Sequence, residues 1–254
     1  DDSDDILFHN ITFRAPLSSM GMWSNSNFDC VTVLDSSYVN FSHCSMIGGA
    51  DETVSLKDCY SCGIHNSIVG GCFSVPRKNV KTHSMAILSQ CNAFKLTGSV
   101  VAGCDRRLPQ IEESSPSPSS MLIAGNLLEC GRTMSLGLKP IQSFNVDIVN
   151  NVFFRSRKTK CPEIHAVNGS TGHALVYQRQ NYVVGDATRE SADIVESGNL
   201  TCTPLAHSHE GYMDWPIAGR VSAGPEHRDS WDNALIDKLG SGKTWKSELE
   251  LPVL

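Results

Sequence analysis

The sequence predicts an all-β protein, a right-handed parallel β-helix, and three observations support this fold class. Short apolar segments separated by Gly, Asn, Ser and Asp run along most of the chain, and a spaced residue triplet recurs in them. No stretch before about residue 225 sustains a 3.6-residue apolar period. The 254 residues, 40% of them hydrophobic, are enough for one sizeable core. We assign residues 1–227 to the solenoid and residues 228–254 to a short C-terminal helix and tail.

The expected strands are apolar segments with partial alternation, the pattern of strands that bury one face. They are Ile6–Phe13, Val31–Leu34, Val39–Met46, Ile64–Val69, Met85–Leu88, Phe94–Val101, Leu122–Leu128, Val146–Phe154 and Leu175–Val184. Between two of them, Ile111–Ser120 is rich in Ser and Pro and is expected to form an exposed loop.

Five of these segments share a triplet: an apolar residue, a small or polar residue three positions later, and a second apolar residue two positions after that. The copies are Phe41/Cys44/Met46, Ile64/Ser67/Val69, Leu96/Ser99/Val101, Ile123/Asn126/Leu128 and Ile148/Asn151/Phe153. They start 23, 32, 27 and 25 residues apart, and a looser copy, Phe8/Ile11/Phe13, precedes them. Repeats of this length built from strands indicate a solenoid whose coils stack on one another. The small polar residues are expected to form ladders at the bends, which a β-sandwich, the competing all-β fold, does not explain.

The last part of the chain has the spacing of a helix. Residues 229–239 (DSWDNALIDKL) carry acidic residues early and a lysine late, and Gly240 follows them. Because the last coil of a solenoid needs a cap, we expect this helix to cover its end.

Charge and hydropathy exclude several classes of partner. The chain has 21 Lys and Arg against 27 Asp and Glu, a net charge of −6. It therefore lacks the basic surface that general nucleic-acid binding needs and the polybasic patch that anionic membranes attract. No run approaches 18 uninterrupted apolar residues, so a transmembrane helix is excluded as well.

Ten cysteines and four glycosylation sequons bear on the compartment. Cys59 and Cys62 have C-x-x-C spacing, but no second pair follows at a zinc-finger distance, so we interpret the cysteines as buried thiols with a few bridges. Sequons at Asn10, Asn40, Asn168 and Asn199 permit a secreted glycoprotein. The chain opens on Asp1-Asp2-Ser3-Asp4-Asp5, so either a signal has been removed or the chain begins inside a longer protein.

Six short motifs, in order along the chain, resemble those of a known family. They are Asn10–Arg14 (NITFR), Val39–Ser45 (VNFSHCS), Gly49–Ser55 (GADETVS), Lys81–Met85 (KTHSM), Cys104–Pro109 (CDRRLP) and Arg228–Gly242. These motifs are similar to segments of the pectate lyases of polysaccharide lyase family 1, and the resemblance covers most of residues 6–245. It implies a secreted parallel β-helix. The family's first coils have no counterpart here. Because an open coil exposes a β-edge, either the chain is a fragment or its first coil packs on a protein partner.

The resemblance implies β-elimination across a 1,4-linked uronic acid, with an acidic polysaccharide as substrate. The difficult step is removal of the proton at C5, and Ca²⁺ and basic side chains assist it by neutralising the adjacent carboxylate. By motif, Asp51, Glu52 and Ser55 are the expected metal ligands. Ser42 and Ser55 stand where many family members have a calcium-binding Asp, so the calcium site is expected to carry less charge and to bind Ca²⁺ jointly with the substrate.

The resemblance also supplies candidate catalytic residues. Arg107 matches the arginine that serves as Brønsted base in the family, which requires strong perturbation or a more electrostatic role, because a guanidinium normally stays protonated. Lys81 would bind the uronate carboxylate, with Lys78 as its rival. His83 lies in the same segment as Lys81 and is the third candidate.

Three further residues are candidate substrate ligands: Arg106, His43 and Gln110. Arg106 competes with Arg107, since neighbours on a strand face opposite ways and only one should face the groove. His43 directly precedes the ladder residue Cys44, so a structural role is its alternative. Gln110 stands where the family often has another arginine.

Two other functions compete with the lyase hypothesis. The first is a non-catalytic β-helix that binds carbohydrate or serves as an assembly component, favoured by the missing coils and the altered calcium positions. The second is a hydrolase that uses paired carboxylates, for which Asp51 and Glu52 are the obvious pair. Because adjacent residues on a strand diverge, this second alternative is weak.

Overall fold

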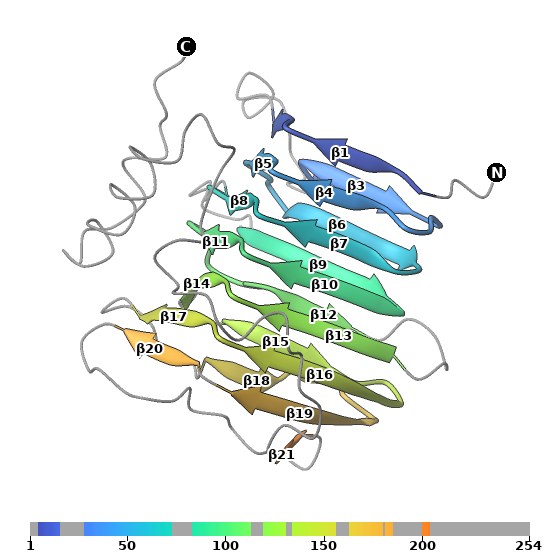
Figure 1. Ribbon diagram of the computed structural model, residues 1–254, viewed down its shortest axis with the longest axis vertical. Helices are drawn as coiled ribbons and strands as arrows, with labels where there is room; N and C mark the ends of the chain where they lie inside the picture. The colour runs from blue at the N-terminus through green and yellow to red at the C-terminus, as the bar shows by residue number, and fades with distance from the viewer. Residues whose placement is uncertain are drawn as a thin grey trace.

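The described part of the chain consists of β-strands in three parallel sheets (Figure 1). A computed structural model describes residues 5–15, 28–72, 83–112, 119–130, 134–155, 163–179, 181–184 and 200–203. Within these residues, no helix has the length and hydropathy that crossing a membrane requires. The C-terminal helix and tail expected for residues 228–254 lie outside the described residues.

The three sheets are called A, B and C. Sheet A contains β1 (Leu7–His9), β4 (Asn40–Ser42), β7 (Cys62–His65), β10 (Ala93–Thr97), β13 (Ser119–Ala124), β16 (Ser143–Val149), β19 (His173–Arg179) and β21 (Leu200–Thr203). Sheet B contains β2 (Thr12–Arg14), β5 (Ser45–Ile47), β8 (Ile68–Gly70), β11 (Val100–Ala102), β14 (Leu127–Cys130), β17 (Val152–Arg155) and β20 (Tyr182–Val184). Sheet C contains β3 (Val31–Leu34), β6 (Glu52–Cys59), β9 (Met85–Cys91), β12 (Gln110–Glu112), β15 (Leu136–Lys139) and β18 (Ile164–Ala166).

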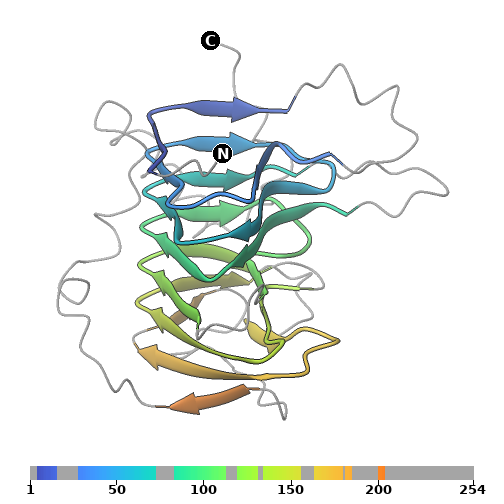
Figure 2. The same cartoon turned by 90° about the vertical axis from the view of Figure 1, so that its right-hand side faces the viewer.

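The chain visits sheets A, B and C in turn, and each strand pairs with its equivalent in the next coil. In sheet A, for example, Phe41 pairs with Ile64 and Ile64 pairs with Leu96. The coils therefore stack along the long axis of the molecule (Figure 2). This arrangement confirms the right-handed parallel β-helix, and the parallel pairing excludes the β-sandwich, whose sheets are antiparallel.

The recurring polar residues form the expected ladder at the bend between sheets A and B. The backbone N–H of each rung donates to the side-chain oxygen of the next: Cys44 to Ser67 (3.0 Å), Ser67 to Ser99 (3.1 Å), Ser99 to Asn126 (2.9 Å), Asn126 to Asn151 (3.0 Å) and Asn151 to Asn181 (3.0 Å). Asn181 is a sixth rung that the sequence pattern did not include. Because the rungs are buried, each satisfies a backbone group that water cannot reach.

A left-handed backbone conformation precedes each rung and turns the chain from sheet A into sheet B. The residues with positive φ are His43, Asn66, Gly98, Gly125 and Asn150, each one position before its ladder residue. Gly and Asn are the residues that adopt this region most readily. His43 is the exception in type, and its position gives it the structural role that was the alternative to substrate binding.

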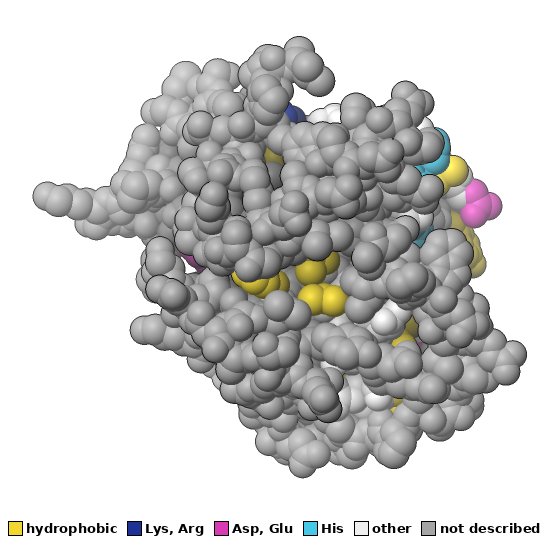
Figure 3. Space-filling view, turned by 60° about the vertical axis from the view of Figure 1, so that its left-hand side comes forward, with side chains coloured by type: hydrophobic (Ala, Val, Ile, Leu, Met, Phe, Trp, Pro, Cys, Tyr) yellow, Lys and Arg dark blue, Asp and Glu magenta, His cyan; other side chains and the backbone are white. Residues whose placement is uncertain are grey.

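The interior of the coils is apolar and is continuous along the helix. Its largest fully buried side chains include Phe41, Phe94, Phe153, Leu56 and Ile87. A smaller apolar cluster of Val100, Ala102 and Leu127 lies on the outward face of sheet B, since these residues alternate with core residues. Figure 3 shows apolar side chains gathered on the side of the molecule that sheet B occupies.

The structure differs from the sequence-based strands in two respects. Most predicted segments that contain a triplet are two strands, one on each side of the ladder residue. Sheet C was largely missed: the sequence indicated β3 and the start of β9, but not β6, β12, β15 or β18. The exposed loop expected for Ile111–Ser120 is wrong at both ends, because Ile111 and Glu112 are buried in β12 and Ser119 and Ser120 begin β13. Stacking on neighbouring coils overrides the local composition there.

Candidate active site

The connection from sheet B to sheet C places two acidic residues at the start of β6. Gly49 and Ala50 form a tight turn in which a Cβ at Gly49 would collide with the carbonyl of Glu52. The backbone N–H groups of Ala50 and Asp51 donate to the carbonyl of Phe28 in the preceding coil (3.0 and 3.1 Å). The turn therefore fixes where Asp51 and Glu52 emerge.

A third carboxylate, Asp29, completes an acidic cluster. Its Oδ1 accepts the backbone N–H of Glu52 (3.1 Å) and its Oδ2 accepts the Thr32 hydroxyl (2.9 Å). The carboxylate oxygens of Asp29, Asp51 and Glu52 all lie within 4.8 Å of one another. The side chain of Glu52 is 3% exposed and that of Asp51 is 23% exposed, so the cluster extends from the interior to the surface.

Two basic residues from later coils meet this cluster. Arg107, between β11 and β12, forms an ion pair with Glu52 through Nη1 and Oε1. His83, just before β9, lies with Nδ1 2.6 Å from Asp51 Oδ1, so an Nδ1 hydrogen is donated to this carboxylate. In a neutral ring Nε2 is then left as a proton acceptor. Four of the residues singled out from the sequence, Asp51, Glu52, Arg107 and His83, thus come together.

Burial raises the pKa of Glu52 to about 8. The Arg107 guanidinium acts in the opposite direction, and the carboxylates of Asp51 and Asp29 raise the pKa further. The cluster therefore holds more negative charge than its one ion-paired arginine neutralises. A perturbed carboxyl of this kind is typical of functional sites, although ion-pair networks produce it as well.

The pKa of Glu52 predicts how stability depends on pH. The folded protein binds this proton more tightly than the unfolded chain, whose glutamate pKa is near 4.5. The stabilisation from Glu52 is therefore complete below pH 4.5 and is lost as pH rises through about 8. We expect the free energy of unfolding of the wild type, relative to Glu52→Gln, to fall across this window. Urea unfolding at several pH values measures it, and a difference that stays flat or rises with pH would contradict the prediction.

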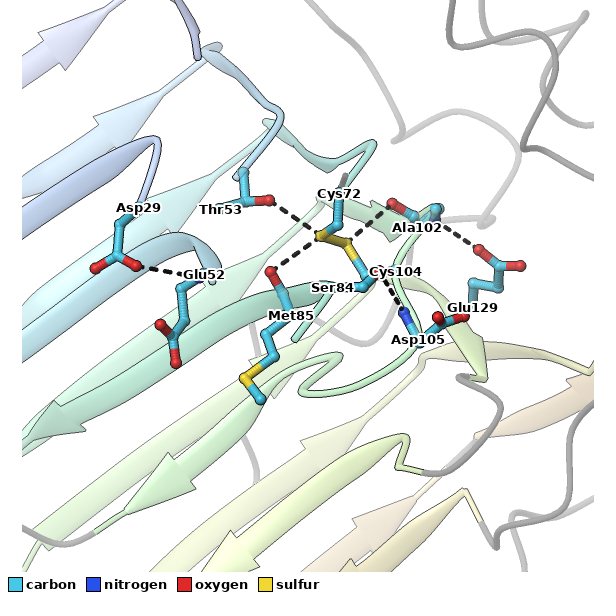
Figure 4. The surroundings of a disulfide bond; sticks show 11 residues. Asp29, Glu52, Thr53, Cys72, Ser84, Met85, Ala102, Cys104, Asp105 and Glu129 are labelled. Carbon is cyan, nitrogen blue, oxygen red and sulfur yellow. Dashed lines mark hydrogen bonds between the residues drawn. A yellow bond between two sulfur atoms is a disulfide. The ribbon is translucent and has the colours of Figure 1, made fainter. Parts of the chain in front are cut away.

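The disulfide Cys72–Cys104 holds the segment that leads to Arg107 (Figure 4). It joins the end of β8 to the turn after β11, and the Thr53 hydroxyl lies 3.2 Å from Cys72 Sγ. The backbone N–H of Asp105 donates to Ser84 Oγ (3.3 Å), which ties the same turn to the segment that carries His83. The two basic residues are thus attached to one another through covalent and hydrogen bonds.

Removing this disulfide is expected to destabilise the fold. The bridge closes a loop with a sequence separation of 32 residues, for which the chain-entropy estimate is about 3–4 kcal/mol. Urea unfolding of Cys72→Ala/Cys104→Ala should show this loss, whereas Cys30→Ala, at a half-buried free thiol, should change stability by much less. Equal losses in the two proteins would show that the bridge itself contributes little.

The other sequence-predicted residues lie elsewhere or outside the described residues. Lys81 and its rival Lys78 belong to the second group. Arg106 is exposed and pairs with Met85 in an isolated bridge. Gln110 is 2% exposed and donates through Nε2 to Glu112 Oε1 on the same face of β12. Substrate binding by Arg106 and Gln110 stays a prediction.

His43, Ser42 and Ser55 complete this set. The Ser42 hydroxyl and His43 Nδ1 are 2.9 Å apart, and the His43 ring packs edge-on against His9, so both residues lie at the bend between sheets A and B. The acidic cluster, by contrast, lies where the chain enters sheet C. Ser55 is fully buried in β6, and its Oγ has no hydrogen-bond partner among the described residues. Metal ligation by Ser55 stays a prediction.

The carboxylates present fit a calcium ion. Ca²⁺ prefers six to eight oxygen ligands, and three carboxylates whose oxygens lie within 4.8 Å of one another supply up to six. The raised pKa of Glu52 points the same way, because a cation would relieve the repulsion among the three groups. The ligands would be Asp29, Asp51 and Glu52.

Asp29 was not among the candidates from the sequence, although a signal for it exists. The first two full triplets are 23 residues apart, and Asp29 precedes Glu52 by the same interval. In the structure β3 and β6 pair Val31 with Val54, so the same register places Asp29 beside Glu52. Subtracting one coil length from a candidate ligand would have found it.

Comparisons with known proteins do not add a relative to this geometry. No protein-family model matches the chain, and a search of curated protein sequences finds no match either.

Proposed function

We propose that this chain is a polysaccharide lyase that cleaves a pectate-like 1,4-linked polyuronate by β-elimination. The observation that carries the proposal is the meeting of Arg107 and His83 with the carboxylates of Asp29, Asp51 and Glu52 at the entry to sheet C. β-Elimination from a uronate needs a positive group beside the substrate carboxylate, a proton acceptor near C5, and anchoring groups that do not themselves react. The cluster offers all three kinds of group.

His83 is the proposed proton acceptor and Arg107 the proposed electrostatic group. The hydrogen bond from Nδ1 to Asp51 orients the imidazole and makes Nε2 the basic atom. Nε2 takes the C5 proton, the C5–H electron pair forms a C4=C5 double bond, and the C4–O4 bond breaks as O4 leaves with a proton. Arg107, charged and paired with Glu52, stabilises the negative charge that builds up on the uronate carboxylate.

A bound Ca²⁺ would supply further neutralisation of the substrate carboxylate. The chain's own carboxylates would hold it at the edge of the cluster, where Asp51 is partly exposed. Secretion, glycosylation and a protein partner for the first coil belong to the same proposal. The Cys72–Cys104 disulfide supports secretion, because such bonds persist in oxidising compartments.

A row of polar side chains on the outward face of sheet C gives a polymer further contacts. Glu112 accepts hydrogen bonds from Gln90 (2.8 Å) and Lys139 (3.2 Å), which flank it on the neighbouring strands, and from Gln110 on its own strand. Hydrogen-bonding side chains in a row along stacked coils suit a chain of sugar hydroxyls and carboxylates. This row favours the second candidate function, a β-helix that binds carbohydrate without cleaving it.

One experiment separates the two functions. Polygalacturonate and related polyuronates are incubated with the protein, with Ca²⁺ or with a chelator, and the ultraviolet absorbance of the unsaturated product is followed. The lyase proposal expects a rise that the chelator reduces. Retarded migration in a gel that contains the polymer, with no rise in absorbance on any polyuronate, would overturn it in favour of carbohydrate binding.

Calcium binding has a readout that does not depend on activity. Protonated Glu52 is a poor ligand, so Ca²⁺ should raise the urea midpoint more at pH 8 than at pH 5. Asp29→Asn should reduce this effect, and Asp35→Asn, at an exposed residue outside the cluster, should leave it unchanged. A Ca²⁺ effect of equal size in Asp29→Asn would remove Asp29 from the ligand set.

A further inference from the structure

Three cysteines come together inside the solenoid, at the corner where the chain passes from sheet C to sheet A. Cys59 ends β6, Cys62 begins β7, and Cys91 ends β9 in the next coil, where it pairs with Cys59 (Figure 1). All three are buried, with exposed fractions of 2%, 2% and 0%. Their Sγ atoms lie within 4.8 Å of one another, and none of them is in a disulfide.

The spacing suits a single thiophilic ion. Zinc–sulfur bonds of about 2.3 Å place neighbouring ligand sulfurs about 3.8–4.0 Å apart, so small side-chain movements would close the three sulfurs around one ion. The C-x-x-C pair alone lacked a partner in the sequence. Cys91 supplies that partner, because the stacked coils place it directly beside Cys59.

A buried hydroxyl lies next to the three sulfurs. Ser89 is two residues before Cys91 on the same inward face of β9 and is 0% exposed. Its Oγ has no partner that meets hydrogen-bond geometry among the described residues, yet it is near enough to Cys91 to lower the pKa of that thiol. Unsatisfied buried polar atoms are uncommon and are often explained by a ligand.

The thiols already behave as a coupled group. Hydrogen bonds from Cys62 and Cys91 lower the pKa of Cys59, while their interaction with Cys59 raises the pKa values of Cys62 and Cys91. One thiolate therefore forms readily, and the other two protons must be displaced by a cation. A divalent ion leaves three thiolates with a net charge of −1, whereas a monovalent ion would leave −2 in an apolar interior, which is far more costly.

We propose that Cys59, Cys62 and Cys91 form a structural site for a divalent thiophilic ion of the zinc class, with the Ser89 hydroxyl in the fourth position. Binding replaces three S–H protons by three metal–sulfur bonds and releases the protons to solvent. The ion fastens β6, β7 and β9 together, and it keeps three thiols out of disulfide exchange in a protein that also contains the Cys72–Cys104 bridge. This proposal does not depend on the lyase function.

The test is refolding of the full chain in the presence of Zn²⁺, followed by dialysis and measurement of bound zinc by atomic emission. We expect one equivalent in the wild type and in Cys44→Ser, a matched control at another buried free thiol. Cys91→Ser should bind zinc at least about tenfold more weakly. Cys62→Ser provides a second test if Cys91→Ser does not give the far-ultraviolet circular dichroism of a folded β-protein.

A Cd²⁺-substituted sample separates this site from the carboxylate cluster. The near-ultraviolet cadmium–thiolate charge-transfer band reports sulfur ligands only, so it should appear in the wild type and be lost in Cys91→Ser. The proposal is overturned if the folded, reduced wild type shows no such band and retains no zinc. It is also overturned if peptide mapping finds a disulfide between two of the three cysteines in the purified protein.

Discussion

Arg107→Ala is expected to lower kcat/KM on the responsive polyuronate by at least about 10²–10³-fold, the loss typical of removing one group that stabilises developing negative charge. Arg107 is the charged partner of Glu52 and is 22% exposed, so its guanidinium is within reach of a ligand at the surface of the cluster. The measurement is the initial rate of unsaturated product formation over a range of substrate concentrations.

Arg106→Ala is the matched control for this variant. It removes the same charge one residue away, from an exposed side chain, and should lower kcat/KM by much less. Because Arg107→Ala leaves buried Glu52 without its counter-charge, the double variant Arg107→Ala/Glu52→Gln checks that lost activity does not reflect unfolding. Activity retained by folded Arg107→Ala, or lost only in Arg106→Ala, would move the catalytic role away from Arg107.

Asn151→Ala is expected to reduce the free energy of unfolding by about 3–5 kcal/mol, because several buried groups lose their partners together. Asn151 Oδ1 accepts the backbone N–H and the side-chain Nδ2–H of Asn126 (3.0 and 2.9 Å). Its Nδ2 donates to the carbonyl of Ile123 (2.9 Å) and to Asn181 Oδ1 (3.0 Å). Urea unfolding followed by circular dichroism measures the loss.

Asn145→Ala in β16 is the control for the ladder variant. Asn145 belongs to the same coil but is exposed, so its replacement should change stability by no more than about 0.5 kcal/mol. Similar urea midpoints for Asn151→Ala and the wild type would mean that water or a shifted neighbour replaces the lost hydrogen bonds. The ladder would then contribute to register and not to stability.

The candidate site was predictable only in part. The motif Gly49–Ser55 identified Asp51 and Glu52, and Cys104–Pro109 identified Arg107, because each motif is a short run of neighbouring residues. Which of the two adjacent arginines meets Glu52 was left open, and the left-handed backbone at Arg107 (φ 54°) belongs to a local turn that alternation along a strand does not describe. Asp29 and the sheet C strands were missed, since β12, β15 and β18 are only three or four residues long.

The sequence by itself determined the repeat, the bend residues and the polar ladder. These features recur once in every coil, so Ser67, Ser99, Asn126 and Asn151 are recognisable from their spacing alone. Only the tertiary structure decided which side chains meet across coils: Asp29 with Glu52, Arg107 with Glu52, and Cys91 with the Cys59–Cys62 pair. The physical reason is that contacts between coils depend on the register of parallel pairing. This register changes with the length of every connecting loop, and the coils here differ in length from 23 to 32 residues.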